Sequence, residues 1–249
     1  MPRSVNCPVL ASPRWVLALT KQALPDAQPR VSMDGCIPFG QIAEHWDSVY
    51  AQGEQTRSWF EQHPAASLRM LDASAVTPQD SVIDIGGGAS LLCDSLLERG
   101  HEDLTVLDVS AAALRITQRR LGPTEHVQWI VADLLTWNPP RTYAAWHDRA
   151  VFHFLTTERD KARYLTTLST ATGPGSVAIF GCFAPDGPQS CSGLPVARYG
   201  TADLVMKLGD DWTLVATERE EHHTPAGGIQ PFTWAAFRRK QSGHPVRSV

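Results

Sequence analysis

Several features that mark specialised classes of protein are missing from this 249-residue chain. No apolar run approaches the roughly 20 residues that a membrane-spanning helix needs, so we expect no membrane partner. Lysine and arginine total 22 against 26 acidic residues, with no basic stripe, and a nucleic-acid partner is not expected either. The five cysteines lie scattered without a C-x-x-C pair. This pattern predicts reduced thiols and a cytoplasmic location.

The two ends of the chain differ from its middle. Residues 1–32 are rich in proline and alanine, and their short apolar stretch is broken by Pro13-Arg14, which disfavours a secretory signal. We interpret 1–32 as a flexible leader; a transit peptide, or a true start at Met33, are the alternatives. Residues 241–249 are expected to form a flexible tail. One domain is predicted over 33–240, and its oligomeric state stays open.

Strand and helix patterns alternate through this domain. Apolar β-prone runs predict seven strands, and amphipathic runs with capping signals predict the helices between them. Gly227-Gly228 between the last two strands predicts a closing hairpin. The fold class is therefore α/β: a doubly wound, Rossmann-like, seven-stranded, mostly parallel sheet with an antiparallel C-terminal edge hairpin. The expected strands are 81–85, 104–109, 127–132, 144–147, 176–182, 212–221 and 231–239. One or two helices are expected over 42–61, and single helices over 67–75, 89–99, 111–121, 158–171 and 202–208.

The most informative stretch reads Val-Ile-Asp-Ile-Gly-Gly-Gly-Ala-Ser over residues 82–90. It joins a strand to a helix through three glycines, which let the backbone approach a ligand closely, and this predicts a nucleotide-type cofactor. The dinucleotide fingerprint G-x-G-x-x-G fails, because Leu91 stands at its third glycine. A second pattern, an acid, a spacer and then G-x-G, fits from Asp84 to Gly88.

Acids also end the next two predicted strands. Asp108 lies twenty residues past Gly88, where a carboxylate can accept hydrogen bonds from both ribose hydroxyls. Asp133 ends the third strand, where a carboxylate can accept from an adenine amino group. Each acid alone would be an ordinary helix cap. Three acids at successive strand ends point instead to a cofactor site.

On these motifs, residues from about 42 to 240 resemble a class I methyltransferase that uses S-adenosylmethionine (SAM). The resemblance implies SAM as cofactor and a methyltransferase activity. It also implies that the first acid and the glycines line the methionine part of SAM, the second acid the ribose and the third the adenine. The residues implied are Asp84, Gly86, Gly87 and Gly88 for methionine, Asp108 for ribose, Asp133 and Leu134 for adenine, and Val109 and His147 as further cofactor contacts.

The segments 45–50 and 58–60 are rich in aromatic residues. They are similar to the entry segment of a branch that includes the citrate synthase lysine methyltransferase. The similarity implies an N-terminal helical lid in which Trp46, Tyr50 and Trp59 fold over the cofactor. Aromatic faces favour a sulfonium cation, and a lid excludes water. The alternative is that the three aromatics simply form the apolar side of a helix.

Residues 146–155 follow the fourth predicted strand and face the transferred methyl group in this fold. His147, Asp148 and His153 are the candidate proton acceptors, since histidine titrates near neutral pH. We expect His147 or His153 nearest the acceptor, with Asp148 orienting it. The alternatives are a structural ion pair between Asp148 and Arg149 and a buried core role for His153.

The acceptor is expected to be a small molecule in an enclosed pocket. Arg149, Cys191, Arg198 and Tyr199 are the expected substrate contacts, and Cys191 favours a thiol or another soft nucleophile. The alternatives are a protein lysine N-methyltransferase and a non-catalytic, SAM-binding regulatory subunit. No ligand pair among the cysteines and histidines has diagnostic spacing, so no metal is expected.

Overall fold

A computed structural model describes residues 39–51 and 57–241 of the chain. The expectations for a leader over 1–32 and for a tail after Gln241 lie outside these residues. No helix in the described ranges has both the length and the apolar character needed to cross a bilayer.

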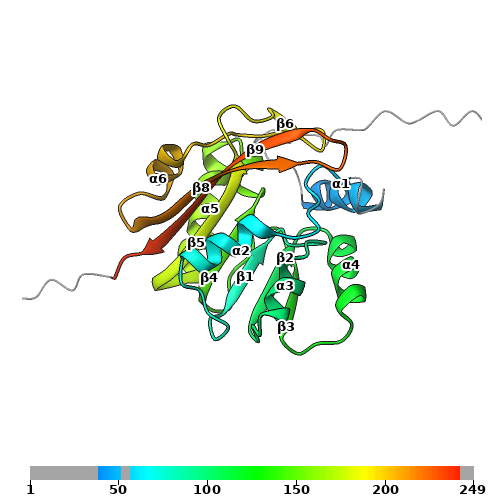
Figure 1. Ribbon diagram of the computed structural model, residues 1–249, viewed down its shortest axis with the longest axis horizontal. Coiled ribbons are helices and arrows are strands. Elements are labelled where there is room, and N and C mark those ends of the chain that lie inside the picture. The colour runs from blue at the N-terminus through cyan, green and yellow to red at the C-terminus, as the bar shows by residue number, and fades with distance from the viewer. Residues whose placement is uncertain (1–38, 52–56, 242–249) are drawn as a thin grey trace, which may run out of the picture.

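One seven-stranded sheet forms the centre of the molecule, in the order β3-β2-β1-β4-β5-β9-β8 (Figure 1). Strands β1 to β5 pair in parallel, and β9 runs antiparallel to both of its neighbours. The predicted α/β fold with an antiparallel C-terminal edge is therefore confirmed. The strands are β1 (Val82–Ile85), β2 (Leu104–Asp108), β3 (Val127–Val131), β4 (Tyr143–Arg149), β5 (Thr172–Phe183), β8 (Trp212–His223) and β9 (Ile229–Arg239).

Helices cover both faces of the sheet. Alternate residues of a strand face opposite sides: Val82 packs in the core shared with α2, α3 and α4, and Ile83 packs in the core shared with α5 and α6. This two-sided burial explains why the parallel strands read as continuous apolar runs. The helices are α2 (Ala65–Ala73), α3 (Leu92–Glu98), α4 (Ala111–Leu121), α5 (Glu158–Ala171) and α6 (Thr201–Leu208).

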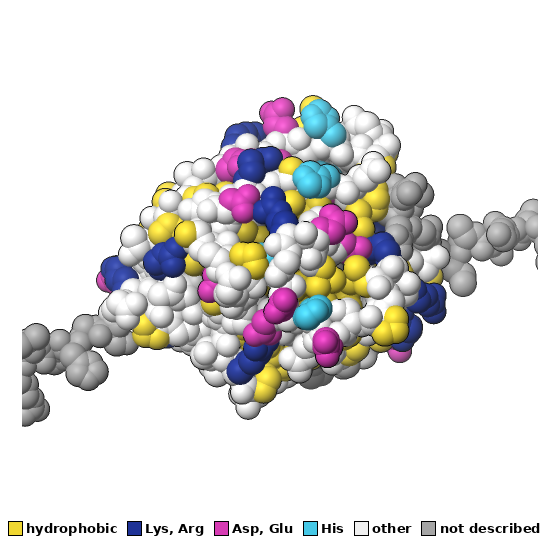
Figure 2. Space-filling view, turned by 60° about the horizontal axis from the view of Figure 1, so that its bottom comes forward, with side chains coloured by type: hydrophobic (Ala, Val, Ile, Leu, Met, Phe, Trp, Pro, Cys, Tyr) yellow, Lys and Arg dark blue, Asp and Glu magenta, His cyan; other side chains and the backbone are white. Residues whose placement is uncertain are grey.

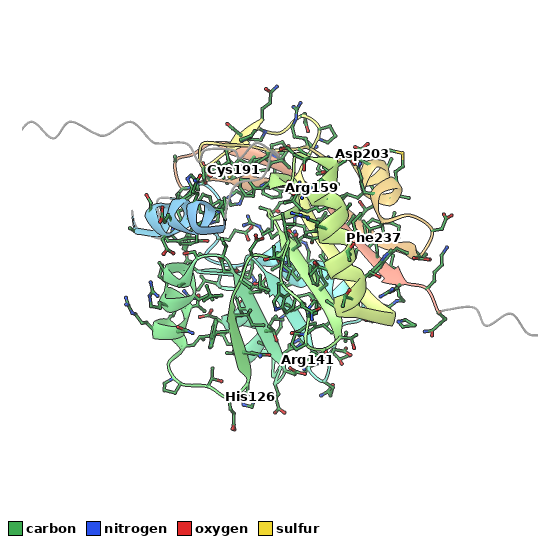
Figure 3. The ribbon with its side chains drawn as sticks, turned by 180° about the vertical axis from the view of Figure 1, so that it is seen from behind. His126, Arg141, Arg159, Cys191, Asp203 and Phe237 are labelled. Atoms are coloured by element: carbon green, nitrogen blue, oxygen red, sulfur yellow. The ribbon has the colours of Figure 1, made fainter. Side chains whose placement is uncertain are left out.

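Three smaller elements gather at the carboxyl ends of the parallel strands. Helix α1 (Phe39–Ala51) contacts α4, the short helix η1 (Phe152–Phe154) follows β4, and β6 (Ser190–Cys191) pairs with β7 (Leu194–Pro195). Figure 3 shows Cys191 at the opposite end of the sheet from His126 and Arg141, which precede β3 and β4. The carboxyl edge is where open α/β sheets bind their ligands.

Some element boundaries differ from those predicted. Helix α3 starts at Leu92 rather than residue 89, because the backbone turns through the glycines and the Ser90 hydroxyl accepts from the Leu92 amide. Strand β4 extends to Arg149, and β5 begins at Thr172. In the stretch 42–61, where one or two helices are expected, the described helix α1 ends at Ala51.

Charged side chains of both signs mix on the surface. Figure 2 shows Lys and Arg interspersed with Asp and Glu on the face in view, in keeping with a formal net charge of −4. On the face in view, the described basic side chains do not line up in a stripe.

Candidate cofactor and acceptor site

The three glycines after β1 form a cradle that no larger residue fits. Gly86 has φ of +66°, and a Cβ added there would lie 2.3 Å from Cγ2 of Val151. A Cβ on Gly87 would lie 2.3 Å from Oδ2 of Asp84, and one on Gly88 would lie 2.5 Å from Oδ2 of Asp108. The backbone therefore comes as close to the two carboxylates as glycine alone allows.

Asp84 and His147 form a buried pair behind this cradle. They are register partners on β1 and β4, and Nδ1 of His147 lies 2.7 Å from Oδ1 of Asp84. An ionised carboxylate only accepts, so Nδ1 carries the proton and donates it. Among the described residues, Oδ2 of Asp84 has no hydrogen-bond partner. A buried acceptor of this kind needs a donor from a ligand or from water.

Asp84 and His147 line the smaller of two adjoining cavities. Gly86, Gly87 and Arg57 contribute to the same wall. The Arg57 guanidinium lies 4.1 Å from the centre of the Tyr50 ring and donates to the Tyr50 carbonyl oxygen at 3.0 Å. A cation and an unsatisfied carboxylate oxygen in one small cavity suit a zwitterionic amino-acid group.

Asp108 is the last residue of β2, and Asp133 follows the end of β3 by two residues. Both line the larger cavity with Val109 and Leu134. Asp108 accepts from the Ser110 amide at 2.8 Å, and burial raises the pKa of its carboxyl group to about 7. Asp133 accepts from the Leu135 amide at 2.9 Å. The two carboxylates can serve a ligand that spans the ends of β2 and β3.

The aromatic segment lies over these cavities. Trp46, Tyr50 and Trp59 line the larger cavity, and the Trp46 and Trp59 rings pack edge-on at 5.9 Å. Both interpretations therefore describe part of the arrangement: the aromatics pack on one another and also face the cavity. Asp47 anchors α1, because its Oδ1 accepts from the Ser110 hydroxyl and from the Ala112 amide at 3.2 Å, at the start of α4.

Beyond the acids, the larger cavity becomes apolar. Its volume is about 440 Å³, and its far wall comes from η1, the end of β5, the β6–β7 hairpin and β9. Cys191 is one of these wall residues, and burial raises the pKa of its thiol, which is therefore protonated at neutral pH. Apolar and aromatic side chains from these elements line this end: Phe154, Leu155, Phe183, Leu194, Pro195 and Phe232.

Arg149 lies where the two cavities meet and lines both. Its Nη1 donates to the Trp59 carbonyl oxygen at 3.0 Å, and its Nη2 lies 3.2 Å from Oε1 of Glu61. Its guanidinium also lies 5.1 Å from the centre of the Phe232 ring. Among the described residues that line the larger cavity, Arg149 is the only basic one.

Asp148 does not orient either histidine, contrary to expectation. Its carboxylate accepts from the Tyr164 hydroxyl at 2.6 Å and from the amides of Val151 and Phe152. Because successive residues of β4 face opposite sides, Asp148 points toward α5 while His147 points to the other face, where it meets Asp84 of β1. Burial raises the pKa of Asp148 to about 6. The alternative pairing with Arg149 is not found either, since Arg149 pairs with Glu61.

His153 is enclosed in the core. It is fully buried, it accepts from the Phe183 amide through Nδ1 at 3.4 Å, and its ring packs 4.7 Å from that of Phe183. Burial, with the nearby charge of Arg149, lowers the pKa of His153 to about 3. It is not among the described residues that line either cavity. These contacts match the core role stated as the alternative.

Two of the four expected substrate contacts lie away from the cavities. Arg198 is exposed and donates to the Gly187 carbonyl oxygen at 3.3 Å. Tyr199 is buried against Phe152, with ring centres 5.2 Å apart. Neither is among the described residues that line the two cavities, whereas Cys191 and Arg149 line the larger one.

The structure also adds residues that the sequence analysis did not single out. Asp160 lines the larger cavity from the first turn of α5, and its Oδ1 is buried without a described hydrogen-bond partner. It was visible in the sequence only as a helix-capping partner of Thr157, which it is. Arg57, Phe154 and Phe232 had no motif to mark them.

Residues 82–175 match the model of the protein family described as "Methyltransferase domain". The chain is 21% identical over 187 residues to malonyl-[acyl-carrier protein] O-methyltransferase 2 of Ilyobacter polytropus, a match that covers 69% of this chain and 70% of that one. It is 30% identical over 83 residues to EEF1A lysine methyltransferase 2 of Danio rerio, covering 30% of this chain and 36% of that one.

Solved structures share the fold. The N-methyltransferase NodS from Bradyrhizobium japonicum, solved with S-adenosylhomocysteine, superposes with a TM-score of 0.61. It is 17% identical in sequence, and the match covers 78% of this chain and 98% of that one. At this identity the likeness concerns the fold.

Proposed function

Because this chain is a SAM-dependent methyltransferase with the class I, Rossmann-like fold, we propose that it transfers the methyl group to a small acceptor molecule with an apolar body. The single observation that carries this proposal is the continuity of the larger cavity. It runs from the acids at the ends of β2 and β3 to an apolar end covered by the β6–β7 hairpin. Concave, mostly apolar cavities with few polar groups are typical of small-molecule sites.

The two cavities suggest how SAM would be held. The glycine cradle and the unpartnered Oδ2 of Asp84 fit the methionine amino group, and Arg57 fits its carboxylate. Asp108 would accept from the ribose hydroxyls and Asp133 from the adenine amino group. When bound, SAM supplies a methyl group activated by its sulfonium. The protein's own residues bind and orient the acceptor and exclude water.

The residues that line the larger cavity favour certain kinds of acceptor atom. No histidine is present among the described residues that line it, and Cys191 is protonated. This lining favours a nucleophile that arrives with a free lone pair or already ionised, such as a carboxylate, an acidic thiol or a neutral amine. Arg149 would attract an anionic group to the junction of the cavities.

A second candidate function is protein lysine N-methylation. The match to EEF1A lysine methyltransferase 2 favours it, as does the aromatic wall formed by Trp46, Trp59 and Phe154. A lysine side chain would need an opening from the surface to the methyl group, and the β6–β7 hairpin lies over that end of the cavity.

An acceptor screen separates these candidates. Full-length protein and SAM are incubated with apolar carboxylic acids, thiols, amines and lysine peptides, and S-adenosylhomocysteine formation is measured. We expect turnover with one small-molecule class and none with peptides. Turnover with lysine peptides alone would favour the second candidate. SAM binding without turnover in any arm would favour a non-catalytic, SAM-binding subunit.

A further inference from the structure

A second polar site lies beside the smaller cavity, outside the set of residues assigned to SAM. Glu61 follows the aromatic segment, and Glu220 and His222 come from β8. One ligand atom from each of the three lies within 4.8 Å of the other two. The His222 side chain is only 4% exposed. Three potential metal ligands therefore meet in a largely buried position.

The hydrogen bond of His222 fixes which ring nitrogen carries the proton. Nε2 lies 2.7 Å from the Ser58 carbonyl oxygen, which can only accept, so Nε2 is the protonated nitrogen of the neutral ring. Nδ1 lies 3.6 Å from Oε1 of Glu61, an ion pair when the ring is protonated. When the ring is neutral, Nδ1 presents a lone pair toward that oxygen, and a cation between the two atoms would replace the proton.

The neighbours of the cluster are arranged like the outer contacts of a metal site. A metal-binding histidine almost always donates its other ring N–H to a carbonyl or carboxylate, as His222 does to Ser58. Binding carboxylates are hydrogen-bonded in turn, and Nε1 of Trp234 donates to Oε2 of Glu220 at 2.6 Å. Each ligand side chain is therefore held by a separate contact.

We propose that Glu61, Glu220 and His222 bind one divalent first-row transition-metal ion, with Zn²⁺ as the best match to one imidazole and two carboxylates. Three protein ligands and a water would complete its preferred tetrahedron. Mg²⁺ fits poorly, because it prefers an octahedron of oxygen ligands. The ion would join the segment that carries Trp59 and Arg57 to the hairpin formed by β8 and β9.

Arg149 is the neighbouring residue whose positive charge disfavours a cation at this site. It approaches Oε1 of Glu61 at 3.2 Å and also donates to the Trp59 carbonyl oxygen. A carboxylate has about four lone-pair positions, so Glu61 can serve both a guanidinium and an ion. With both glutamates ionised, their two negative charges balance the divalent ion. The guanidinium of Arg149 then gives the cluster a net charge of +1.

The test is calorimetric titration of the tag-free, full-length protein, stripped with a chelator, with ZnCl₂ and separately with MgCl₂. We expect one Zn²⁺ per chain with micromolar or tighter affinity, no comparable Mg²⁺ binding, and a higher melting temperature with Zn²⁺. No stoichiometric Zn²⁺ binding to the wild-type chain would overturn the proposal.

Matched variants locate the ion. Glu220→Gln keeps an acceptor for Trp234, and His222→Ala removes the imidazole, while Glu221→Gln and His223→Ala are their controls on the next residues of β8. We expect Zn²⁺ affinity to fall by at least about tenfold in the first two variants and to stay unchanged in the controls. If His222→Ala does not fold, Glu220→Gln decides alone. Equal affinity in Glu220→Gln and Glu221→Gln would overturn the assignment.

Discussion

Nδ1 of His147 donates to Oδ1 of Asp84 across the β1–β4 pairing, at 2.7 Å. The bond fixes the carboxylate at the floor of the glycine turn and leaves its second oxygen without a partner among the described residues. Under the proposed function, His147 would position Asp84 rather than act as a base for the acceptor. Catalysis would then rest on orientation and exclusion of water.

Removing the charge of Asp84 should weaken SAM binding. Asp84→Asn loses a hydrogen bond to a charged group, which is worth about 1.5–3 kcal/mol, so the dissociation constant should rise by about 10- to 100-fold. Calorimetric titration measures it, with Asp103→Asn as the control, since Asp103 pairs with Arg141 at the far end of the sheet. Equal affinities for both variants would remove Asp84 from the cofactor site.

Asp108 should make SAM binding depend on pH. Its pKa is raised by burial to about 7, so the folded protein holds a proton that the unfolded chain loses above about pH 4. Its contribution to stability is therefore full at low pH and is lost as the pH rises through about 7. Ribose hydroxyls favour the ionised form, so SAM affinity should rise from about pH 5.5 to about pH 8. Asp108→Asn should bind weakly without this dependence, and a pH-independent wild type would contradict the assignment.

His153 should matter for stability more than for turnover. Truncating this buried ring to alanine leaves a cavity and should lower the free energy of unfolding by about 2–4 kcal/mol. Denaturant unfolding measures that loss, and turnover per folded molecule with SAM at saturation should change by less than about threefold. A folded His153→Ala variant whose turnover falls a hundredfold would restore the catalytic role predicted from the sequence.

Asp47 should hold the lid in place. Asp47→Ala removes two hydrogen bonds to the start of α4, together worth about 1–2 kcal/mol, and should free α1 from the cofactor cavity. Hydrogen exchange of α1 should then speed up, and SAM should bind about tenfold more weakly. Glu44→Ala, on the exposed side of the same helix, is the control. Unchanged exchange would show that α1 is held by other contacts.

The fold was predictable because its signals are local. Buried parallel strands leave continuous apolar runs, the capping signals include Ser110 and Thr157 at the starts of α4 and α5, and the glycines mark the turn after β1. The acids at the ends of β1, β2 and β3 meet at one edge because parallel strands share a direction.

The catalytic side of the site was harder to predict. The alternation of β4 separates His147 from Asp148, and this could have been inferred had the strand been extended to Arg149. The positions of Arg198 and Tyr199 depend on the path of an irregular loop. Such a loop has no hydrophobic periodicity from which its path could be predicted. Glu61 and His222 are 161 residues apart in sequence, so no local spacing could pair them.

The most direct test of the account is calorimetric titration of the purified chain with SAM, S-adenosylhomocysteine and NAD. We predict micromolar binding of both SAM compounds and no binding of NAD, because Leu91 replaces the third glycine of a dinucleotide site. Binding of NAD alone, or of none of the three, would contradict the cofactor assignment and every role derived from it.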